Sequence, residues 1–207
     1  TSSTELINFS HNLAKENIEI DILINNAALN PKIISGKNSL ENKFRLEDYD
    51  ENLWDLELDV GLKSAFLCSK FFGTKMASRN YPGVILNIAS DLSIISPTQS
   101  IYKIDGISEN MQPVKPITYS VIKSGLIGMT KYLATYWCDK GIRCNAISPG
   151  GVYDSQSDLF LKKLSKLIPL GRMADSNEYK SAIQFLCSDA SSYMTGHNLV
   201  IDGGRSV

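Results

Sequence analysis

The chain has 207 residues, of which 43% are hydrophobic and 21% are charged, and its formal net charge at pH 7 is −1. This length suits one domain with a sizeable core, and we expect that domain to span 1–207. The nearly neutral charge predicts no nucleic-acid partner and no anionic membrane surface. The longest apolar runs, such as 84–88, are far too short to span a bilayer.

The cysteines and histidines predict no metal site. Metal-ligand patterns need clustered cysteine and histidine side chains, and here none of the cysteines has C-x-x-C spacing. With no signal peptide at the start, these cysteines are typical of buried, reduced thiols in a cytoplasmic protein. The residues concerned are Cys68, Cys138, Cys144, Cys187, His11 and His197.

The beginning of the sequence predicts a preceding segment. It starts at Thr1 with no methionine, in the cap of a helix whose apolar spacing covers 3–17. The next segment, 21–26, has the composition of a strand that is apolar on both faces. Such a strand at the edge of a sheet would leave an unpaired apolar edge, which proteins normally avoid. We therefore expect further strands before Thr1.

The rest of the chain alternates between strand-like and helical segments. Apolar runs rich in Ile, Val and Leu recur with the length of strands, and they suit a parallel sheet covered on both faces. Helical patterns separate them, which is the signature of right-handed βαβ units. We predict a Rossmann-type α/β fold with a doubly wound parallel sheet and three α/β/α layers, lacking its first strands. The predicted strands are 21–26, 83–89, 141–148 and 198–202, and the later helices 50–78, 118–139, 157–167 and 176–189.

Residues 91–118 interrupt this alternation. They contain Pro97, Pro113 and Pro116 and show no clear period. A loop this long inside a compact domain is usually functional or disordered. We interpret it as a substrate-side loop, with irregular solvated surface as the alternative.

Small or polar clusters follow three of the predicted strands. They are Asn25–Ala28, Asn87–Ser90 and Ser148–Gly151. Ligands of an open parallel sheet bind at the carboxyl ends of its strands, so these clusters are candidates for one site. The first would form a cofactor wall, the second would offer the Ser90 hydroxyl, and the third would let the backbone approach a flat ring. Each cluster alone is more often a simple turn.

Tyr119 and Lys123 are the predicted catalytic pair. Four residues along a helix place both side chains on one face. A phenol with its usual pKa of ~10 is a poor base at neutral pH, and a nearby ammonium lowers that pKa towards the value that proton transfer needs. Lys123 would also donate hydrogen bonds to a cofactor sugar. Ser90 would hold the substrate oxygen.

The spacing alone is weak evidence, because Tyr136 and Lys140 repeat it. They lie on the same predicted helix, about 25 Å farther along. Tyr119 stands near the helix start, where a helix that runs back along the sheet begins beside the strand ends. We therefore expect Tyr136 to be packed or exposed, with no catalytic role.

In order along the chain, these motifs resemble those of the short-chain dehydrogenases/reductases. Asn25–Ala28 resembles the family's Asn-Asn-Ala-Gly motif, Asn87–Ser90 the strand end with its catalytic serine, and Tyr119 and Lys123 its catalytic pair. The terminal Asp-Gly-Gly points to the single-domain branch. Further segments that resemble family landmarks are Ile142–Gly150, Pro169–Met173 and Val200–Gly204.

The resemblance implies hydride transfer between NAD or NADP and a small carbonyl or alcohol substrate, with Ser90, Tyr119 and Lys123 as catalytic residues. It also implies a homodimer or homotetramer formed through the helices at 50–78 and 118–139. The implied cofactor-binding residues are Asn26, Ala27, Ala28, Ile88, Tyr119, Lys123, Pro149, Gly150, Gly151 and Val152.

The sequence departs from the family in three ways. The glycine-rich phosphate loop would precede Thr1, so the pyrophosphate loses its main anchor. Gly61 stands where the family has a catalytic asparagine, and we expect an asparagine there to raise turnover. These two departures keep open an alternative, a catalytically impaired relative or fragment that acts through dimer or tetramer association.

The third departure is the length of the loop between Ser90 and Tyr119. It resembles a subgroup linked to bacterial surface-sugar biosynthesis, which implies a sugar-like substrate. The side chains expected to line a polar pocket for it are Tyr102, Lys103, Glu109 and Met111.

Overall fold

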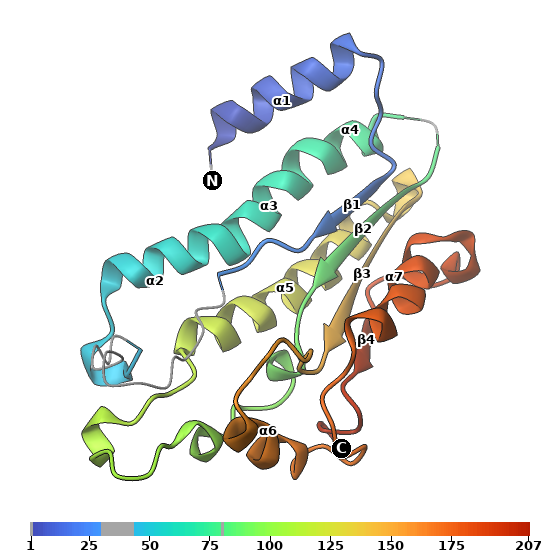
Figure 1. The fold of residues 1–207 in the computed structure, drawn as a ribbon. Helices are drawn as coiled ribbons and strands as arrows, with labels where there is room; N and C mark the ends of the chain where they lie inside the picture. The colour runs from blue at the N-terminus through green and yellow to red at the C-terminus, as the bar shows by residue number, and fades with distance from the viewer. Residues whose placement is uncertain (1, 30–43, 80) are drawn as a thin grey trace.

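A computed structural model describes residues 2–29, 44–79 and 81–207, and their fold is α/β (Figure 1). The strands follow one another in the sheet in chain order, and every neighbouring pair is parallel. This confirms the predicted fold class. The strands are β1 (Ile22–Asn25), β2 (Gly83–Ile88), β3 (Ile142–Pro149) and β4 (Asn198–Ile201).

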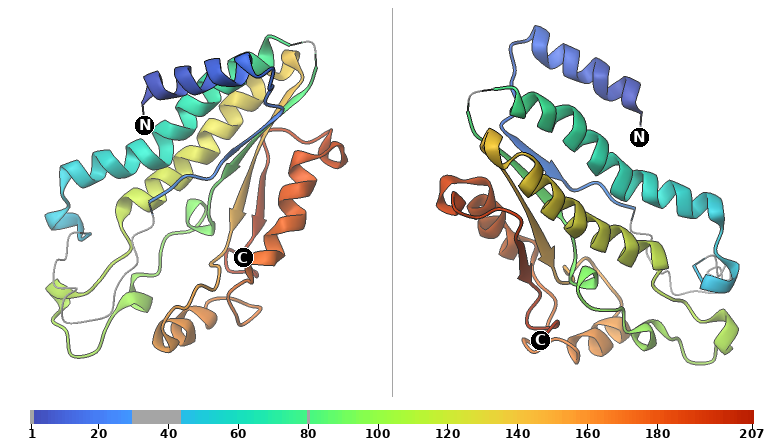
Figure 2. Two further views of the ribbon diagram at one scale, coloured as in Figure 1. Left: turned by 45° about the horizontal axis from the view of Figure 1, so that its top comes forward. Right: turned by 180° about the vertical axis from the view of Figure 1, so that it is seen from behind.

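Helices cover both faces of the sheet, as Figure 2 shows. On one face, α1 (Ser3–Lys15), the long helical segment 51–77 and α5 (Ile117–Tyr136) lie side by side. The other face carries α7 (Lys180–Cys187). A short helix, α6 (Asp158–Ser165), lies beyond the carboxyl ends of the strands.

The alternation of side chains along β2 explains the two layers. Ile85 packs into a cluster with Leu133 of α5, whereas the next residue, Leu86, packs with Leu186 of α7 on the opposite face. The side chains of Ile85, Leu86 and Leu186 are fully buried, and that of Leu133 is 8% exposed. Each fully buried side chain of this kind contributes about 1.5–3 kcal/mol. A strand that is apolar at every position therefore needs a helix on each side.

The predicted helix 50–78 is present, but two π-helical segments interrupt it. It begins after Asp50, whose side chain accepts a hydrogen bond from the backbone N–H of Asn52. The first irregular segment contains the buried Gly61, which packs directly against α5. The successive parts are α2 (Glu51–Leu58), a π segment (Asp59–Lys63), α3 (Ser64–Cys68), a second π segment (Ser69–Gly73) and α4 (Thr74–Ala77).

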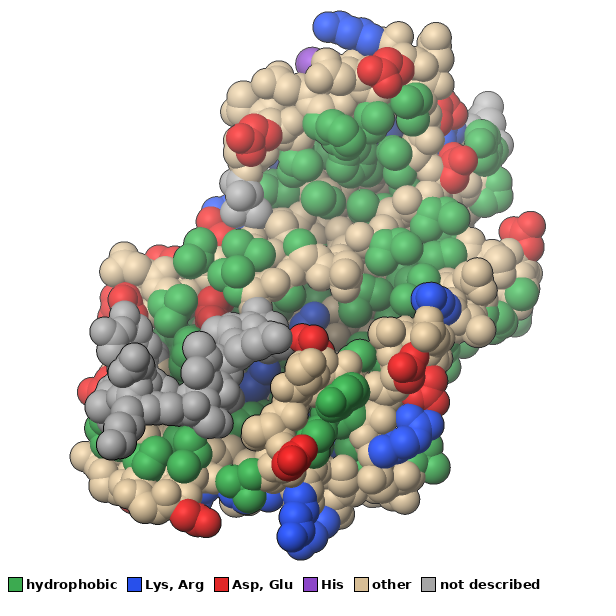
Figure 3. Space-filling model, in the orientation of Figure 1, with side chains coloured by type: hydrophobic (Ala, Val, Ile, Leu, Met, Phe, Trp, Pro, Cys, Tyr) green, Lys and Arg blue, Asp and Glu red, His purple; other side chains and the backbone are tan. Residues whose placement is uncertain are grey.

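Among the described residues, β1 forms one edge of the sheet. Leu23 packs towards the helices, whereas Ile22 and Ile24 are 46% and 44% exposed. Figure 3 shows apolar side chains gathered over α1 and this edge of the sheet, and Ile7 and Phe9 of α1 are also exposed. In the parts of the chain that the structure describes, no helix combines the length and the apolar character needed to cross a bilayer.

Candidate functional site

The first two strands of the site are held together by buried amides. Asn25 and Asn87 are partners in register, and Asn25 Nδ2 donates to Asn87 Oδ1 over 2.8 Å. Asn87 Nδ2 in turn donates to Thr130 Oγ1 of α5, also over 2.8 Å. Because buried amides need partners, this network fixes the ends of β1 and β2 against α5. Asn26, which follows Asn25, is exposed beyond the strand.

Ser90 stands two residues after β2, at the start of a short 3-10 turn. It is 4% exposed. Its Oγ donates to Asp91 Oδ1 over 2.8 Å and accepts from the backbone N–H of Leu92 over 3.2 Å. These contacts fix its position and leave one lone pair of the hydroxyl oxygen for another partner.

Tyr119 and Lys123 lie in the first turns of α5, which begins directly after Pro116. Lys123 Nζ donates to the carbonyl oxygen of Ile88 over 2.7 Å, and it lies 5.8 Å from the centroid of the Tyr119 ring. The Ser90 hydroxyl is close enough to the Tyr119 phenol to influence its pKa. The structure thus brings Ser90, Tyr119 and Lys123 together at the end of β2.

A second lysine, which the sequence analysis did not select, also faces Tyr119. Lys115 Nζ lies 3.7 Å above the centroid of the Tyr119 ring. A cation over the face of an aromatic ring is attracted by it, and the attraction grows when the site excludes water. Lys115 stands four residues before Tyr119, but it precedes the helix, so helical spacing gave no reason to select it.

Burial controls the ionisation of this site. It raises the pKa of the Tyr119 phenol; a hydrogen bond donated by Ser90 would oppose the rise, and the negative charge of Asp91 adds to it. Burial also lowers the pKa of Lys123 and of Lys115 to about 8 each, and Asp91 partly opposes this fall at Lys115. At neutral pH the arrangement is therefore a neutral phenol beside two ammonium groups, which suits a general acid.

A buried ion pair lies directly behind Ser90. Arg205 donates from Nη1 to Asp91 Oδ2 over 2.6 Å, and the two side chains are only 7% and 4% exposed. Sequence reasoning missed this pair because its members are 114 residues apart. The adjacency of Asp91 to Ser90, and of Arg205 to the terminal Asp-Gly-Gly, was the only signal available.

A second buried carboxylate anchors the start of α5. Glu57 of α2 accepts hydrogen bonds from the hydroxyl of Tyr49, over 2.6 Å, and from Thr118. Burial and the bond to Glu57 raise the pKa of Tyr49. Because Thr118 precedes Tyr119, this cluster fixes the first turn of α5 against α2.

Gly61 brings no polar group to the site, because glycine has no side chain. A Cβ built on it would lie 2.7 Å from Cγ2 of Ile122, the residue before Lys123. The packing leaves no room for an asparagine unless the Ile122 side chain or α5 shifts. This argues against the expectation that an asparagine at position 61 would raise turnover.

The residues expected to bind a cofactor lie at neighbouring strand ends. Pro149 ends β3 beside Ile201 of β4. A Cβ on Gly150 would lie 2.8 Å from Cα of Asp202, so only glycine fits there. Half-buried Gly151 and Val152 follow, whereas Asn26, Ala27 and Ala28 are exposed at the end of β1. Ile88, between these two groups, carries the carbonyl that binds Lys123.

The loop 91–118 is packed rather than simply solvated. Ile101 is buried in a cluster with Leu164 of α6. Tyr102 packs on Phe160 with 5.5 Å between ring centroids, and burial raises its pKa to about 12, while Arg205 opposes the rise. Lys103 and Glu109, by contrast, pair with each other at 2.7 Å on the surface, and Met111 is half-buried. Tyr102 is close enough to Tyr119, Asp91 and Arg205 for these groups to affect its pKa.

The second Tyr-x-x-x-Lys motif lies away from the site, as expected. Tyr136 is 60% exposed and stacks on Tyr132, with 5.5 Å between the ring centroids. The structure differs from the prediction in one respect, because α5 ends at Tyr136 and Lys140 follows in a 3-10 turn.

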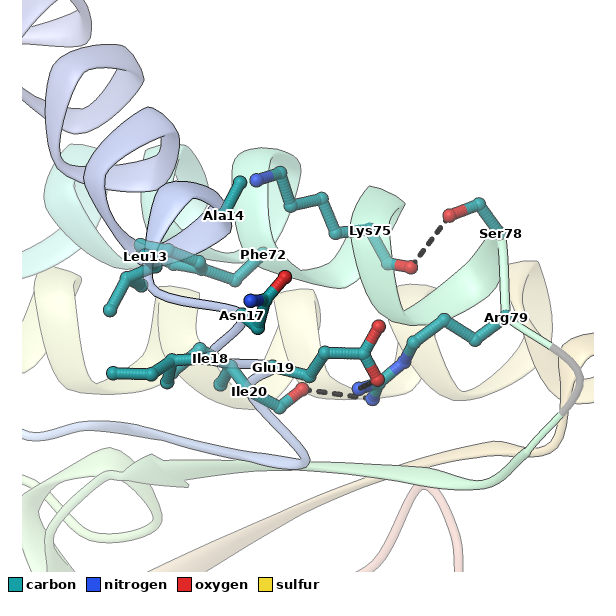
Figure 4. Close-up of a pocket in the computed structure, with 10 residues that line it drawn as sticks. All are labelled: Leu13, Ala14, Asn17, Ile18, Glu19, Ile20, Phe72, Lys75, Ser78 and Arg79. Carbon is teal, nitrogen blue, oxygen red and sulfur yellow. Dashed lines mark hydrogen bonds and ion pairs between the residues drawn. The ribbon is translucent and has the colours of Figure 1, made fainter.

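A cavity of 420 Å³ lies at the other end of the sheet, between α1 and α4 (Figure 4). Arg79 lines it and donates to Glu19 over 3.1 Å, to Asp21 over 2.9 Å and to the carbonyl of Ile20 over 2.9 Å. Each of these bonds holds the segment that leads into β1. We assign Arg79 a structural role. Within the described ranges, no three histidine, cysteine or acidic side chains gather as metal ligands would.

Comparisons with known proteins agree with this geometry. A family model described as enoyl-(acyl carrier protein) reductase matches residues 1–206. The chain is 32% identical to the NAD-dependent glycerol dehydrogenase of Listeria innocua, over 93% of this chain and 72% of that protein. It is also 32% identical to the 2-dehydro-3-deoxy-D-gluconate 5-dehydrogenase of Bacillus subtilis, over 91% of this chain and 66% of that one.

A solved structure of a short chain dehydrogenase from Leptospira borgpetersenii, with bound NAD+, superposes with a TM-score of 0.86 and 31% identity. The match covers 100% of this chain and 72% of that one. The chain therefore spans about two thirds to three quarters of the length of these relatives. With a family model over nearly every residue and relatives of this similarity, the chain belongs to the short-chain dehydrogenase/reductase family.

Proposed function

We propose that the protein is an NAD(P)-dependent oxidoreductase that interconverts a carbonyl and a secondary alcohol, with Tyr119 as the general acid/base. The observation that carries this proposal is the convergence of Ser90 and Tyr119 with Lys123 at the end of β2. Residues 1–207 would form its oxidoreductase domain, with 91–118 as the substrate-side loop. A cavity of 380 Å³ that adjoins the start of α5 and is bordered by this loop supports the second assignment.

A nicotinamide ring, when bound, supplies or accepts the hydride. In the direction of reduction, Tyr119 gives its phenol proton to the substrate oxygen as the carbonyl carbon receives the hydride. The positive charge of Lys123 then stabilises the tyrosinate that remains. Ser90 would position the substrate oxygen. In the direction of oxidation, tyrosinate takes the proton of the alcohol.

The strand ends fit a flat, uncharged ring. Gly150 and Gly151 present backbone without side chains, and Pro149 and Val152 flank them with apolar surface. We propose that these residues hold the nicotinamide end, that Asn26, Ala27, Ala28 and Ile88 border the adjoining ribose, and that Tyr119 and Lys123 contact the same ribose. The cofactor named for the Listeria relative and bound in the Leptospira structure supports NAD, and NADP is the alternative.

The substrate is proposed to be a small molecule, sugar-like or polyhydroxylated. The names of the Listeria and Bacillus relatives, which refer to glycerol and to a dehydro-deoxy-gluconate, support this class. We also propose a homodimer or homotetramer, because the long helices carry exposed Leu56, Phe66 and Tyr132. The free cysteines support a reducing, cytoplasmic location.

A second candidate is a catalytically impaired relative or fragment that acts through association. Gly61, which supplies no amide at the position of the family asparagine, favours it. The discriminating measurement is a fluorescence titration of the 207-residue protein with NADH and NADPH. Saturable enhancement supports the enzyme, and the preferred nucleotide names the cofactor. A folded sample that binds neither supports the second candidate.

The catalytic role of Tyr119 is tested by Tyr119→Phe, with Tyr136→Phe as the matched control. Both changes remove one phenol hydroxyl from α5. We expect the first to abolish turnover and leave the unfolding transition in place, and the second to retain turnover. Turnover that survives in Tyr119→Phe would refute the assignment.

A further inference from the structure

We propose that Lys115 is a positioning residue for this reaction: its ammonium group, held over the ring of Tyr119 by the loop 91–118, stabilises the tyrosinate that remains when the phenol gives up its proton. The inference rests on the proposed function of Tyr119 and deepens it. Lys115 lies outside the Tyr-x-x-x-Lys motif, and it belongs to the loop rather than to α5. Two lysines from different elements would therefore act on one phenol.

The contact between Lys115 and Tyr119 is direct. Lys115 Nζ lies 3.7 Å from the centroid of the Tyr119 ring, whereas Nζ of Lys123 lies 5.8 Å from it. The face of a neutral ring attracts a cation in this position. When the phenol ionises, its negative charge is shared between the oxygen and the ring, so the ammonium then faces a full opposite charge. The contact is stronger with the tyrosinate than with the phenol, and only such a difference can affect a rate.

The backbone of Lys115 is fixed by one side chain and one proline. Gln99 Oε1 accepts from the backbone N–H of Lys115 over 2.8 Å, and Gln99 Nε2 donates to its carbonyl oxygen over 3.3 Å. Pro116 follows Lys115, and a residue before proline is restricted to extended backbone. Gln99 begins a 3-10 turn of the loop that also contains the buried Ile101. The packed loop therefore determines where the Lys115 side chain starts.

Tyr119 is anchored independently of the loop. Thr118, the residue before it, donates to the buried carboxylate of Glu57 on α2. The same carboxylate accepts from the hydroxyl of Tyr49 over 2.6 Å. The ring is thus fixed through α2, and the ammonium through the loop. Because both groups are already in place, the stabilisation needs no rearrangement at the moment when the charge develops.

The charge on Lys115 depends on its surroundings. Burial lowers the pKa of Lys115 to about 8, Asp91 and Glu57 oppose this fall, and Lys123 adds to it. The group is therefore an ammonium at neutral pH, and it loses its charge as the pH rises through about 8. Its stabilisation of the tyrosinate is present below this pH and fades above it.

The proton and the hydride balance without any change in the protonation of Lys115. In the direction of reduction, the O–H bond of Tyr119 breaks as an O–H bond forms on the substrate oxygen. The new C–H bond at the carbonyl carbon takes the hydride of the reduced nicotinamide. Tyr119 then recovers a proton from the solvent. Lys115 lowers the free energy of the tyrosinate during this interval, so the phenol is a stronger acid in reduction, and more of it is ionised for oxidation.

The direct test compares the pKa of Tyr119 in Lys115→Arg and in Lys115→Met. Arginine remains charged and stacks on aromatic faces, whereas lysine at this position loses its charge at about pH 8, before the phenol ionises. Methionine keeps an unbranched stem without the charge. The protein carries 3-fluorotyrosine, whose phenol is more acidic than that of tyrosine, and 19F NMR follows the titration without cofactor or substrate. Tyr119→Phe assigns the resonance.

We expect the pKa of Tyr119 to be lower in Lys115→Arg than in Lys115→Met by about one unit or more, since a neighbouring opposite charge shifts a pKa by about 1–3 units. A difference below about 0.3 units overturns the proposal. The matched control is the pair Lys131→Arg and Lys131→Met, which makes the same two changes at an exposed position of α5. These two variants should show the same pKa of Tyr119.

An independent arm leaves Lys115 unchanged and tests its contact at neutral pH. In protein labelled with 13C at lysine Cε, the Tyr119 ring should shift the Cε protons of Lys115 upfield, and Lys115→Met assigns them. We expect this shift to disappear in Tyr119→Leu and to shrink in Gln99→Leu, which removes both bonds to the Lys115 backbone and no charge. Cε protons with the shift of a solvated lysine in the wild type overturn the proposal, even where Lys115→Arg does not fold. Because neither arm uses turnover, a failure of the proposed function appears separately, as activity that survives in Tyr119→Phe.

Discussion

Gly61→Asn tests whether packing or chemistry determines the residue at this position. In the structure, a Cβ there meets Cγ2 of Ile122 at 2.7 Å and Cδ1 at 3.0 Å. Overpacking of this kind costs about 1–3 kcal/mol, and a buried amide without partners costs about 1–3 kcal/mol more. The better helix propensity of asparagine over glycine stabilises the helix by less than about 1 kcal/mol. We expect the free energy of unfolding to fall by about 2–4 kcal/mol.

The same displacement is expected to lower turnover. Ile122 directly precedes Lys123, and both lie in the first turns of α5, so a side chain that pushes Ile122 also moves the Lys123 ammonium away from Ile88. A misplacement of about 1 Å can reduce a rate by about 100-fold. Urea unfolding followed by circular dichroism gives the stability, and initial rates on the same samples give the turnover.

A double-mutant cycle tests whether contact with Ile122 causes the loss of stability. Gly61→Ala adds only the Cβ, and Ile122→Ala removes the atoms that it meets. If the contact is responsible, Gly61→Ala destabilises the wild type but is neutral or stabilising in Ile122→Ala, because the two changes are coupled through one contact. A Gly61→Asn protein that is as stable as the wild type and turns over faster would refute the reasoning and restore the catalytic interpretation of this position.

Three further predictions follow from the charges and surfaces of the fold. Arg205→Met leaves Asp91 buried without its partner, so urea unfolding at pH 7 should show a loss of about 3–5 kcal/mol, and an unchanged midpoint would contradict the buried pair. Burial lowers the pKa of Lys123 from 10.5 to about 8. Between about pH 8 and 10.5 the unfolded chain therefore retains a proton that the folded protein has released, and the stability of the wild type should rise relative to Lys123→Met. Phe66→Glu places a charge on an exposed apolar side chain of α3, and sedimentation should show smaller assemblies if this helix forms the proposed interface.

The sequence predicted the fold because its strands are apolar on both faces. β2, for example, has no solvated position, and only a parallel sheet with helices on both sides satisfies such a run. The position of Ser90 beside Tyr119 followed from the same topology, since the strand that precedes Ser90 and the helix that begins near Tyr119 meet at one edge of the sheet. Motifs at successive strand ends are therefore predictable from local patterns.

The electrostatic surroundings of Tyr119 were not predictable in this way. Arg205 approaches Asp91 from the segment after β4, and Glu57 approaches Thr118 from the neighbouring helix α2. No periodicity relates residues so far apart in the chain. The two π-helical segments were also missed, because hydrophobic spacing cannot distinguish them from the α-helix that they interrupt.

The two Tyr-x-x-x-Lys motifs show why these long-range contacts matter more than the spacing. Both tyrosines lie on α5, yet Tyr136 is solvated and stacks on another tyrosine, whereas Tyr119 is half-buried and has Lys115 over its ring. In water, a lysine four residues away has little effect on a phenol, because the solvent screens the charge. In the enclosed site, where less water screens the charge, Lys123 lies 5.8 Å from the centroid of the Tyr119 ring. The chemistry of Tyr119 is thus determined by the burial of its partners, and the spacing only places it where that burial occurs.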